Sequence, residues 1–137
     1  ILPETRTPGA KAADVGPFMA VMVRDTYDTR EQQVFREGMR ALDAACRDLH
    51  DVSFVAAAPA QRLALLQELD AEQIEHMKTR TDDAPAHYFR MMKELALLGY
   101  FTSEVGYKQA MRYVETPGRY DRCVPYEPGD KAWARHA

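Results

Sequence analysis

One stretch of this chain, from about Ala86 to Tyr113, most constrains how it can fold. It reads AHYFRMMKELALLGYFTSEVGYKQAMRY, and its first half is apolar on nearly every side, which is typical of a helix surrounded by neighbouring helices. We therefore expect a core helix here. Pro85 suits the first turn of this helix, and Gly99 lies where a left-handed C-cap would end it.

A second helix should follow directly, from about Glu104 to Tyr113. Thr102 or Ser103 can cap its start by accepting a hydrogen bond from a free backbone amide. The helix dipole favours the negative charge of Glu104 in the first turn. The two helices should therefore form a helical corner.

Three further helices are expected before the core helix, each with one apolar face. After a short helix around Lys11 to Asp14, the first should open at Pro17. A capping-box pattern at Thr29 and Gln32 marks the start of the second, and Pro59 marks the start of the third. The apolar faces are expected to comprise Phe18, Val21 and Met22 in the first helix, Phe35, Met39, Leu42, Cys46 and Leu49 in the second, and Leu63, Leu66, Leu69 and Met77 in the third.

The chain has 137 residues, of which 46% are apolar, enough for one modest core. We expect one all-α domain, a compact bundle of about four to five helices. The bundle (residues 9–113) should lie between an extended arm (1–8) and an irregular C-terminal tail (114–137). The net charge of −3 argues against a nucleic-acid-binding protein, which would show a strongly basic face. The longest apolar run is far shorter than the roughly 20 residues that cross a bilayer, so no direct membrane span is expected.

The C-terminal tail changes character after Tyr113. Pro-Gly pairs and Pro125 mark turns, and no periodic run is long enough for a helix or a strand. Tyr, Trp and Arg concentrate between these turns, and such side chains are enriched at binding hot spots. We expect the tail and the end of the core helix to dock on a partner protein through Tyr100, Phe101, Tyr113, Arg119, Tyr120, Cys123, Tyr126 and Trp133. The alternative is that the same aromatic side chains fold back over the chain's own helices.

Residues with catalytic or metal-binding chemistry are few. His76 has Glu72 one turn before it, but the second Glu-x-x-His motif of a two-metal bundle is missing, which favours a solvated charged face. The phosphate loops GxGxxG and GxxxxGK[ST] are absent. Cys46 falls on the apolar face of its helix, where a thiol packs as a small hydrophobe. We therefore expect no catalytic, cofactor-binding or metal-binding residue in this chain.

Two segments give the chain a family resemblance. FRMMKELALLGYFTSEVG, in the expected core helix and its corner, is followed at close range by PGRYDRCVPYEPGDKAW. Together, from about residue 86 to residue 133, they resemble the gluconate 2-dehydrogenase subunit 3 family, the small accessory subunits of bacterial membrane-associated flavin dehydrogenases. The resembling segments contain no catalytic motif.

The resemblance implies a non-catalytic subunit that binds a large flavoprotein, a sugar or sugar-acid dehydrogenase of the glucose-methanol-choline type. A cytochrome c subunit can complete such a complex. FAD would lie in the large subunit, and this chain would hold no cofactor. The small subunit would help the catalytic subunit to fold, to take up its flavin and to leave the cell through a twin-arginine signal upstream of Ile1. The complex would work in the periplasm, at the membrane.

Cys123 lies in the resembling segment, and the implied compartment permits disulfides. It can bond to a cysteine of the catalytic subunit, bond to Cys46, or remain a free thiol. The resemblance favours the intersubunit bond, and the apolar position of Cys46 argues against the internal one.

Two other classes of function remain open. A stand-alone helical enzyme would use Glu72 with His76, or a reactive Cys123, and would show turnover as the purified chain alone. A helical adaptor would bind some other protein.

Overall fold

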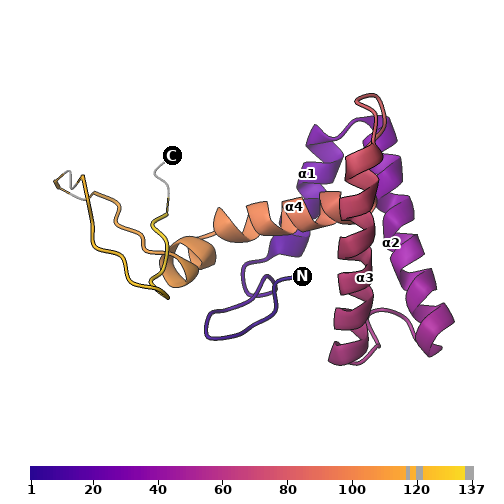
Figure 1. Cartoon of the computed structure of the whole chain (residues 1–137), viewed down its shortest axis with the longest axis horizontal. Coiled ribbons are helices and arrows are strands. Elements are labelled where there is room, and N and C mark those ends of the chain that lie inside the picture. Colours follow the sequence, from indigo (N-terminus) through magenta and orange to yellow (C-terminus); the bar gives the residue numbers. More distant parts are fainter. Residues whose placement is uncertain (117, 120–121, 135–137) are drawn as a thin grey trace.

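The structure is a computed structural model that describes residues 1–116, 118–119 and 122–134. Its helices, in chain order, are α1 (Val15–Thr26), α2 (Thr29–His50), α3 (Pro59–Thr79), α4 (Tyr88–Phe101) and the short π-helix η1 (Gly106–Ala110). The predicted all-α fold is confirmed. In Figure 1, α2 and α3 lie side by side and α4 crosses them. The tail begins after η1 and projects away from α1, α2 and α3.

α4 is the centre of the fold, as the sequence predicts for the core helix. It contacts α1, α2, α3 and η1, and half of its residues are buried: Phe89, Met91, Met92, Leu95, Ala96, Gly99 and Tyr100. The helix begins at Tyr88 with His87 as its N-cap. Pro85 therefore lies before the helix, and the prediction that it occupies the first turn is wrong.

Gly99 lies inside α4 and does not end it, contrary to the expected left-handed cap. The helix continues to Phe101, and its C-cap, Thr102, has right-handed backbone angles. A Cβ at position 99 would overlap the ring of Phe18 on α1. The glycine is needed because α1 approaches α4 closely at this point.

The helical corner after α4 is shorter than predicted. The expected helix from Glu104 to Tyr113 contracts to η1, and the backbone is extended at Met111. Ser103 caps this turn as predicted, because its Oγ accepts a hydrogen bond from the Gly106 amide at 3.0 Å. A Cβ at Gly106 would overlap the carbonyl group of Tyr100, so η1 folds back tightly against the end of α4.

Three apolar clusters make up the core, and α4 contributes to each. The cluster with α1 and α2 contains Val23, Phe35, Met91, Met92 and Leu95. The cluster with α2 and α3 contains Cys46, Ala57, Leu65, Leu69 and Phe89. The third contains Val15, Ala96 and Tyr100, and Leu2 of the N-terminal arm packs on it. The Leu2 carbonyl also accepts a hydrogen bond from the Ala10 amide, so the arm folds back on the helices and is not extended. Residues 10–14, expected to include a short helix, form a turn.

The buried faces of the first three helices agree with the predicted ones in part. Phe35 and Cys46 in α2 and Leu69 in α3 are buried as predicted, and Leu42 and Leu66 pack against the cluster of Cys46 and Leu69. The buried residues that the prediction missed are Val15 and Val23 in α1, Gly38 in α2, and Leu65 and Gln73 in α3. Predicted face residues that are instead exposed are Val21, Met39, Leu49 and Leu63. Gly38 is buried because it admits the ring of Tyr88 of α4 where a larger residue would exclude it.

The capping box of α2 is also one residue earlier than predicted. Asp28 accepts a hydrogen bond from the Glu31 amide at 2.8 Å, and Glu31 accepts one from the Asp28 amide at 3.0 Å. The Gln32 side-chain amide instead donates hydrogen bonds to the carbonyl groups of Arg24 and Tyr27, and these bonds close the turn between α1 and α2. A reciprocal cap of this kind satisfies two amides that would otherwise have no partner in the first turn.

Candidate partner-binding surface

Arg112 anchors the base of the C-terminal tail. Its amide donates to the Ala132 carbonyl, and its carbonyl accepts from the Ala134 amide, each at 2.8 Å. Its guanidinium lies 2.7 Å from a carboxylate oxygen of Asp130, and its Cζ lies 5.5 Å from the centre of the Trp133 ring. One arginine thus joins the chain leaving η1 to the far end of the tail by backbone, ionic and cation–π contacts.

Two further contacts support this base. The Lys131 ammonium donates a hydrogen bond to the Gln109 carbonyl in η1. Ala134 is the one residue of the described tail that is buried. The Asp130 carboxylate also accepts a hydrogen bond from the Glu127 amide, and this bond and the Arg112 ion pair lower the pKa of Asp130. The tail is therefore a loop with a closed base, and not a free end.

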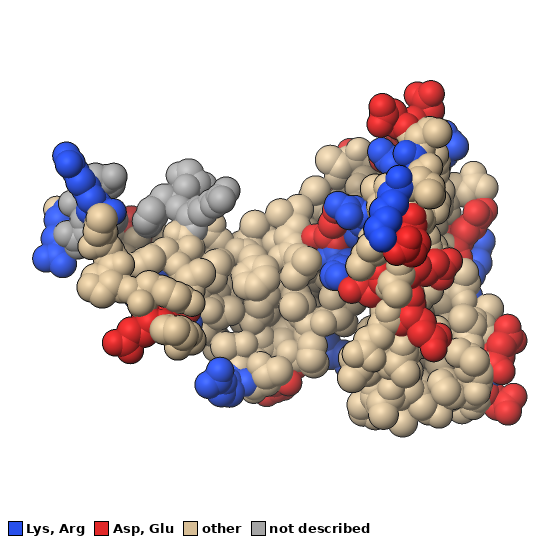
Figure 2. Space-filling model, viewed as in Figure 1, with Lys and Arg blue, Asp and Glu red and all other residues tan. Residues whose placement is uncertain are grey.

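Exposed apolar side chains lie along this loop. We call five of them the tail surface: Tyr113, Val114, Val124, Tyr126 and Trp133. Tyr126 is 70% exposed and Trp133 is 50% exposed, which is unusual for large aromatic side chains. In Figure 2 the waist between the helices and the tail is mostly tan, whereas charged side chains gather over the bundle and at the outer tip of the tail loop. The alternative that these aromatics pack on the chain's own helices does not describe Tyr126 and Trp133.

The structure places the eight predicted interface residues differently. Phe101, Tyr113, Arg119, Cys123, Tyr126 and Trp133 are all exposed. Tyr100 is only 4% exposed, and its ring packs in the third core cluster, so it supports the fold from inside. Tyr120 lies outside the described residues.

The two cysteines lie in different environments. Cys46 is 0% exposed within the α2–α3–α4 cluster, and Cys123 is exposed on the tail. Both are free thiols, so the internal disulfide between them is not formed. Only Cys123 is placed where another protein could reach it.

His87 is a buried polar residue that sequence reasoning missed. Its Nδ1 accepts a hydrogen bond from the Phe89 amide at 3.2 Å, and its Nε2 lies 3.5 Å from an oxygen of Glu72 on α3. Burial lowers the pKa of His87, and Glu72 partly opposes this effect. His76 stacks near it, with 5.4 Å between ring centres. The one local signal for this role is the position of His87 directly before the apolar run, where an N-cap belongs.

The Glu72, His76 and His87 side chains therefore meet at the junction of α3 and α4. Within the described part of the chain, no group of three or more His, Cys, Asp or Glu residues could hold a metal ion. The arrangement instead caps α4 and joins it to α3. None of the helices in that part of the chain combines the length and apolar character needed for a bilayer crossing.

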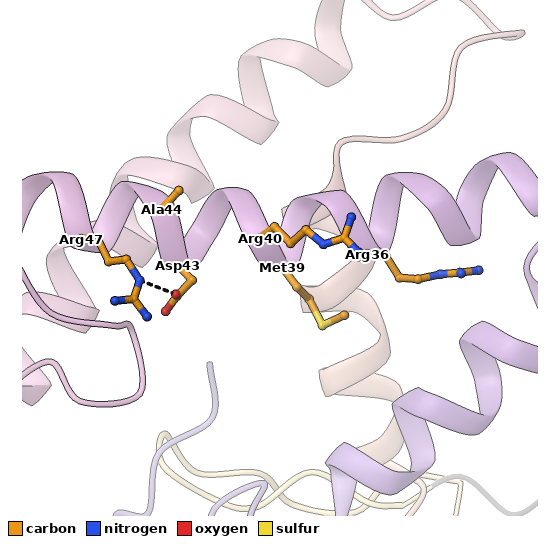
Figure 3. Close-up of a pocket in the computed structure, with 6 residues that line it drawn as sticks. All are labelled: Arg36, Met39, Arg40, Asp43, Ala44 and Arg47. Atoms are coloured by element: carbon orange, nitrogen blue, oxygen red, sulfur yellow. Dashed lines mark hydrogen bonds and ion pairs between the residues drawn. The ribbon is translucent and has the colours of Figure 1, made fainter.

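A hollow lies along one side of α2, as Figure 3 shows. It is lined by Arg36, Met39, Arg40, Asp43, Ala44 and Arg47, all from this one helix. Asp43 accepts hydrogen bonds from the Phe54 amide and from Arg47 Nε, each at 2.8 Å, and these bonds lower its pKa. Because the carboxylate of Asp43 is engaged in these two hydrogen bonds, the hollow presents mainly arginine and methionine side chains.

A family model for Gluconate 2-dehydrogenase subunit 3 matches residues 1–118. The chain belongs to this family. No curated protein and no solved structure matches the chain.

The subunit 3 match overlaps the resemblance seen in the sequence but extends further toward the N-terminus and less far into the tail. The resembling segments lie at about residues 86–133, whereas the match begins at residue 1 and ends at residue 118. The family pattern thus includes the arm, every helix and Arg112, and it ends before Tyr126 and Trp133. The family name describes one subunit of a dehydrogenase, so membership favours an accessory subunit over a stand-alone enzyme.

Proposed function

We propose that this chain is the non-catalytic small subunit of a periplasmic, FAD-dependent dehydrogenase complex that oxidises a sugar or sugar acid. Its catalytic partner is a large flavoprotein of the glucose-methanol-choline type, and FAD belongs to that partner. The small subunit assists folding, flavin loading and twin-arginine export of the catalytic subunit. A cytochrome c subunit can complete the complex.

The observation that carries this proposal is the tail surface. A family of dehydrogenase subunits needs a face that contacts another subunit, and this chain exposes Tyr126 and Trp133 on a loop that projects from its helices. Aromatic side chains offer large contact areas with few rotatable bonds, which lowers the entropy lost on binding. The exposed Phe101 at the end of α4 extends the same apolar character toward the helices.

Cys123 lies between the two ends of the loop and is exposed. We propose that it forms a disulfide with a cysteine of the catalytic subunit once both are exported, because the periplasm is oxidising. On a non-reducing gel the complex should migrate as one covalent species, and the Cys123→Ser variant should separate into two. Identical migration with and without reductant would exclude the bond.

The main experiment is to produce the large flavoprotein subunit with and without this chain. Soluble protein, flavin absorbance, export and dye-linked sugar dehydrogenase activity are then measured for each. The proposal expects flavin-loaded, exported enzyme only when this chain is present. Equal flavin loading, export and activity in its absence would contradict it. Turnover by the purified small chain alone would support the enzyme alternative instead.

A pair of variants separates the tail surface from general effects of exposed apolar residues. Tyr126→Ala removes the most exposed aromatic side chain in the described part of the tail, and Val55→Ala truncates an exposed apolar side chain in the α2–α3 connector. We expect the tail variant to weaken association with the large subunit and the connector variant to leave it unchanged. Equal effects would remove the tail from the interface.

A further inference from the structure

We propose that Arg112 is a positioning residue that holds the tail surface in its binding conformation before the partner arrives. This inference rests on the proposed function, since it concerns how the same surface is prepared. The partner face that fits it is apolar, because Tyr126 and Trp133 are 70% and 50% exposed. Figure 2 shows a mostly uncharged waist and both positive and negative side chains toward the outer tip of the tail loop.

The contacts of Arg112 differ from those of an ordinary surface arginine. Its backbone pairs with two residues at the far end of the loop, Ala132 and Ala134. Its side chain simultaneously reaches Asp130 and the face of Trp133. The guanidinium is planar, so it can pair with a carboxylate along its edge while its face lies over an indole, which a lysine ammonium cannot do.

The Arg112 side chain adds the ionic and aromatic contacts that hold Trp133 at the base of the loop. Residues 122–133 are exposed, so apolar burial contributes little there. Closing a long loop is opposed by chain entropy. Without the Arg112 side chain, the base keeps the two backbone hydrogen bonds of residue 112, the Lys131 contact with η1, the Tyr107–Tyr113 ring contact and the buried Ala134. Removal of the side chain should therefore loosen Trp133 and the segment before it.

A closed loop matters because ordering a flexible segment at the moment of binding reduces affinity. In the structure Arg112 lies beneath the loop and contacts Trp133, one of the residues of the tail surface. Arg112 is only partly exposed, so its effect on binding would pass through the loop's conformation. This distinguishes it from Tyr126, which would contact the partner directly.

The chain's single tryptophan allows a direct test. The full chain labelled with 5-fluorotryptophan and mixed with unlabelled large subunit gives one ¹⁹F resonance, which reports on Trp133 in the free chain and in the complex. Arg112→Ala should move this resonance toward its position in the urea-unfolded chain, while far-UV circular dichroism and the melting temperature of the helices stay near the wild-type values. Arg112→Lys should give a smaller displacement, because it keeps the charge for Asp130 but loses the planar contact with Trp133.

Affinity for the large subunit is measured on the same variants. Ordering a few side chains on binding lowers affinity by on the order of tenfold. We therefore expect Arg112→Ala to bind the large subunit about tenfold more weakly than the wild type. Asp130→Asn should weaken binding less. Tyr126→Ala should weaken binding without moving the ¹⁹F resonance of the free chain, since Tyr126 is outside the base of the loop.

The outcomes separate the two proposals. If the wild-type chain does not bind the large subunit, the proposed function fails. If the wild-type chain binds and Arg112→Ala binds equally well, or if its ¹⁹F resonance does not move, the positioning role of Arg112 is overturned while the proposed function stands. A displaced resonance together with weakened binding and intact helices supports the positioning role.

Discussion

The hydroxyl of Tyr100 donates a hydrogen bond to the Pro8 carbonyl at 2.6 Å and so joins two residues 92 positions apart in the chain. Tyr100 lies near the end of α4, and Pro8 lies in the N-terminal arm. The bond closes the third core cluster, where Leu2 of the arm packs with Val15 and Ala96. A residue that composition alone suggests for an interface thus fastens the arm to the core helix.

Tyr100→Phe should lower the free energy of unfolding by about 1 kcal/mol, because the ring still packs but the Pro8 carbonyl loses its partner. Urea denaturation followed by circular dichroism measures this change. Tyr126→Phe is the matched control, since its side chain is exposed and its hydroxyl can bond to water. An unchanged stability for Tyr100→Phe would mean that the bond contributes nothing to the fold.

Two Gly→Ala changes should differ in size. At Gly38 the new Cβ would overlap the inner atoms of the Tyr88 ring, and overpacking of roughly 1–3 kcal/mol outweighs the gain of about 1 kcal/mol in helix propensity. At Gly16, in the first turn of α1, a Cβ meets nothing within 4 Å apart from its chain neighbours. Pro17 follows, and its ring disfavours a helical residue with a Cβ directly before it, which offsets the gain in helix propensity, so Gly16→Ala should change the free energy of unfolding by less than about 1 kcal/mol. Thermal melts of both variants provide the test, and a stabilising Gly38→Ala would contradict the close packing of Tyr88.

His87 should make the stability of the fold depend on pH. Burial lowers its pKa in the folded protein below the ordinary value of 6.5, so the unfolded chain binds the proton first as the pH falls. The free energy of unfolding should therefore decrease as the pH drops from about 6.5 through the lowered folded pKa, and it should be fully restored above 6.5. Protonation also removes the Nδ1 lone pair that accepts from the Phe89 amide.

The variant His87→Asn tests this dependence. Asparagine can cap the helix but does not titrate, so the decrease in this pH range should become smaller than in the wild type. The lowered pKa values of Asp43 and Asp70 act at lower pH, where those carboxylates take up protons. An identical pH profile for the variant and the wild type would mean that His87 does not contribute.

The two thiols should differ in reactivity. In the reduced native protein a thiol reagent should modify Cys123 rapidly and Cys46 only after unfolding in urea, since Cys46 is fully buried. Quantitative labelling with mass spectrometry should therefore find one modified thiol in the native chain and two in the unfolded chain. Two fast thiols in the native chain would show that the α2–α3–α4 cluster opens readily.

The sequence was sufficient to predict the core helix, because a run that is apolar on every side has few other places in a small protein. It was not sufficient for the faces of the outer helices. In α2, Met39 and Leu49 fit the helical period as well as the residues that are buried. Gly38 decides which face is buried, because it has no side chain. Such a contact depends on Tyr88 from a distant segment and leaves no local signal.

The same limit applies to the candidate surface. Composition identified the aromatic residues of the tail, and Tyr126 and Trp133 are indeed exposed. Composition could not reveal that Arg112 pairs with the far end of the loop, because the partners are distant in sequence and form no periodic pattern. Nor could it separate Tyr100 from Phe101, adjacent aromatic residues whose rings touch edge to face, although one is 4% exposed and the other 39%.

The position of α4 has a consequence for the order in which a complex can form. This helix touches every other helix and also leads through η1 into the tail, and its last turns are packed against Phe18 of α1. The direction in which the tail points is therefore set only after α1 has docked. A partner that binds the end of α4 and the tail together would not bind partly folded chains. Assembly would then act as a proofreading step on the folding of the small subunit.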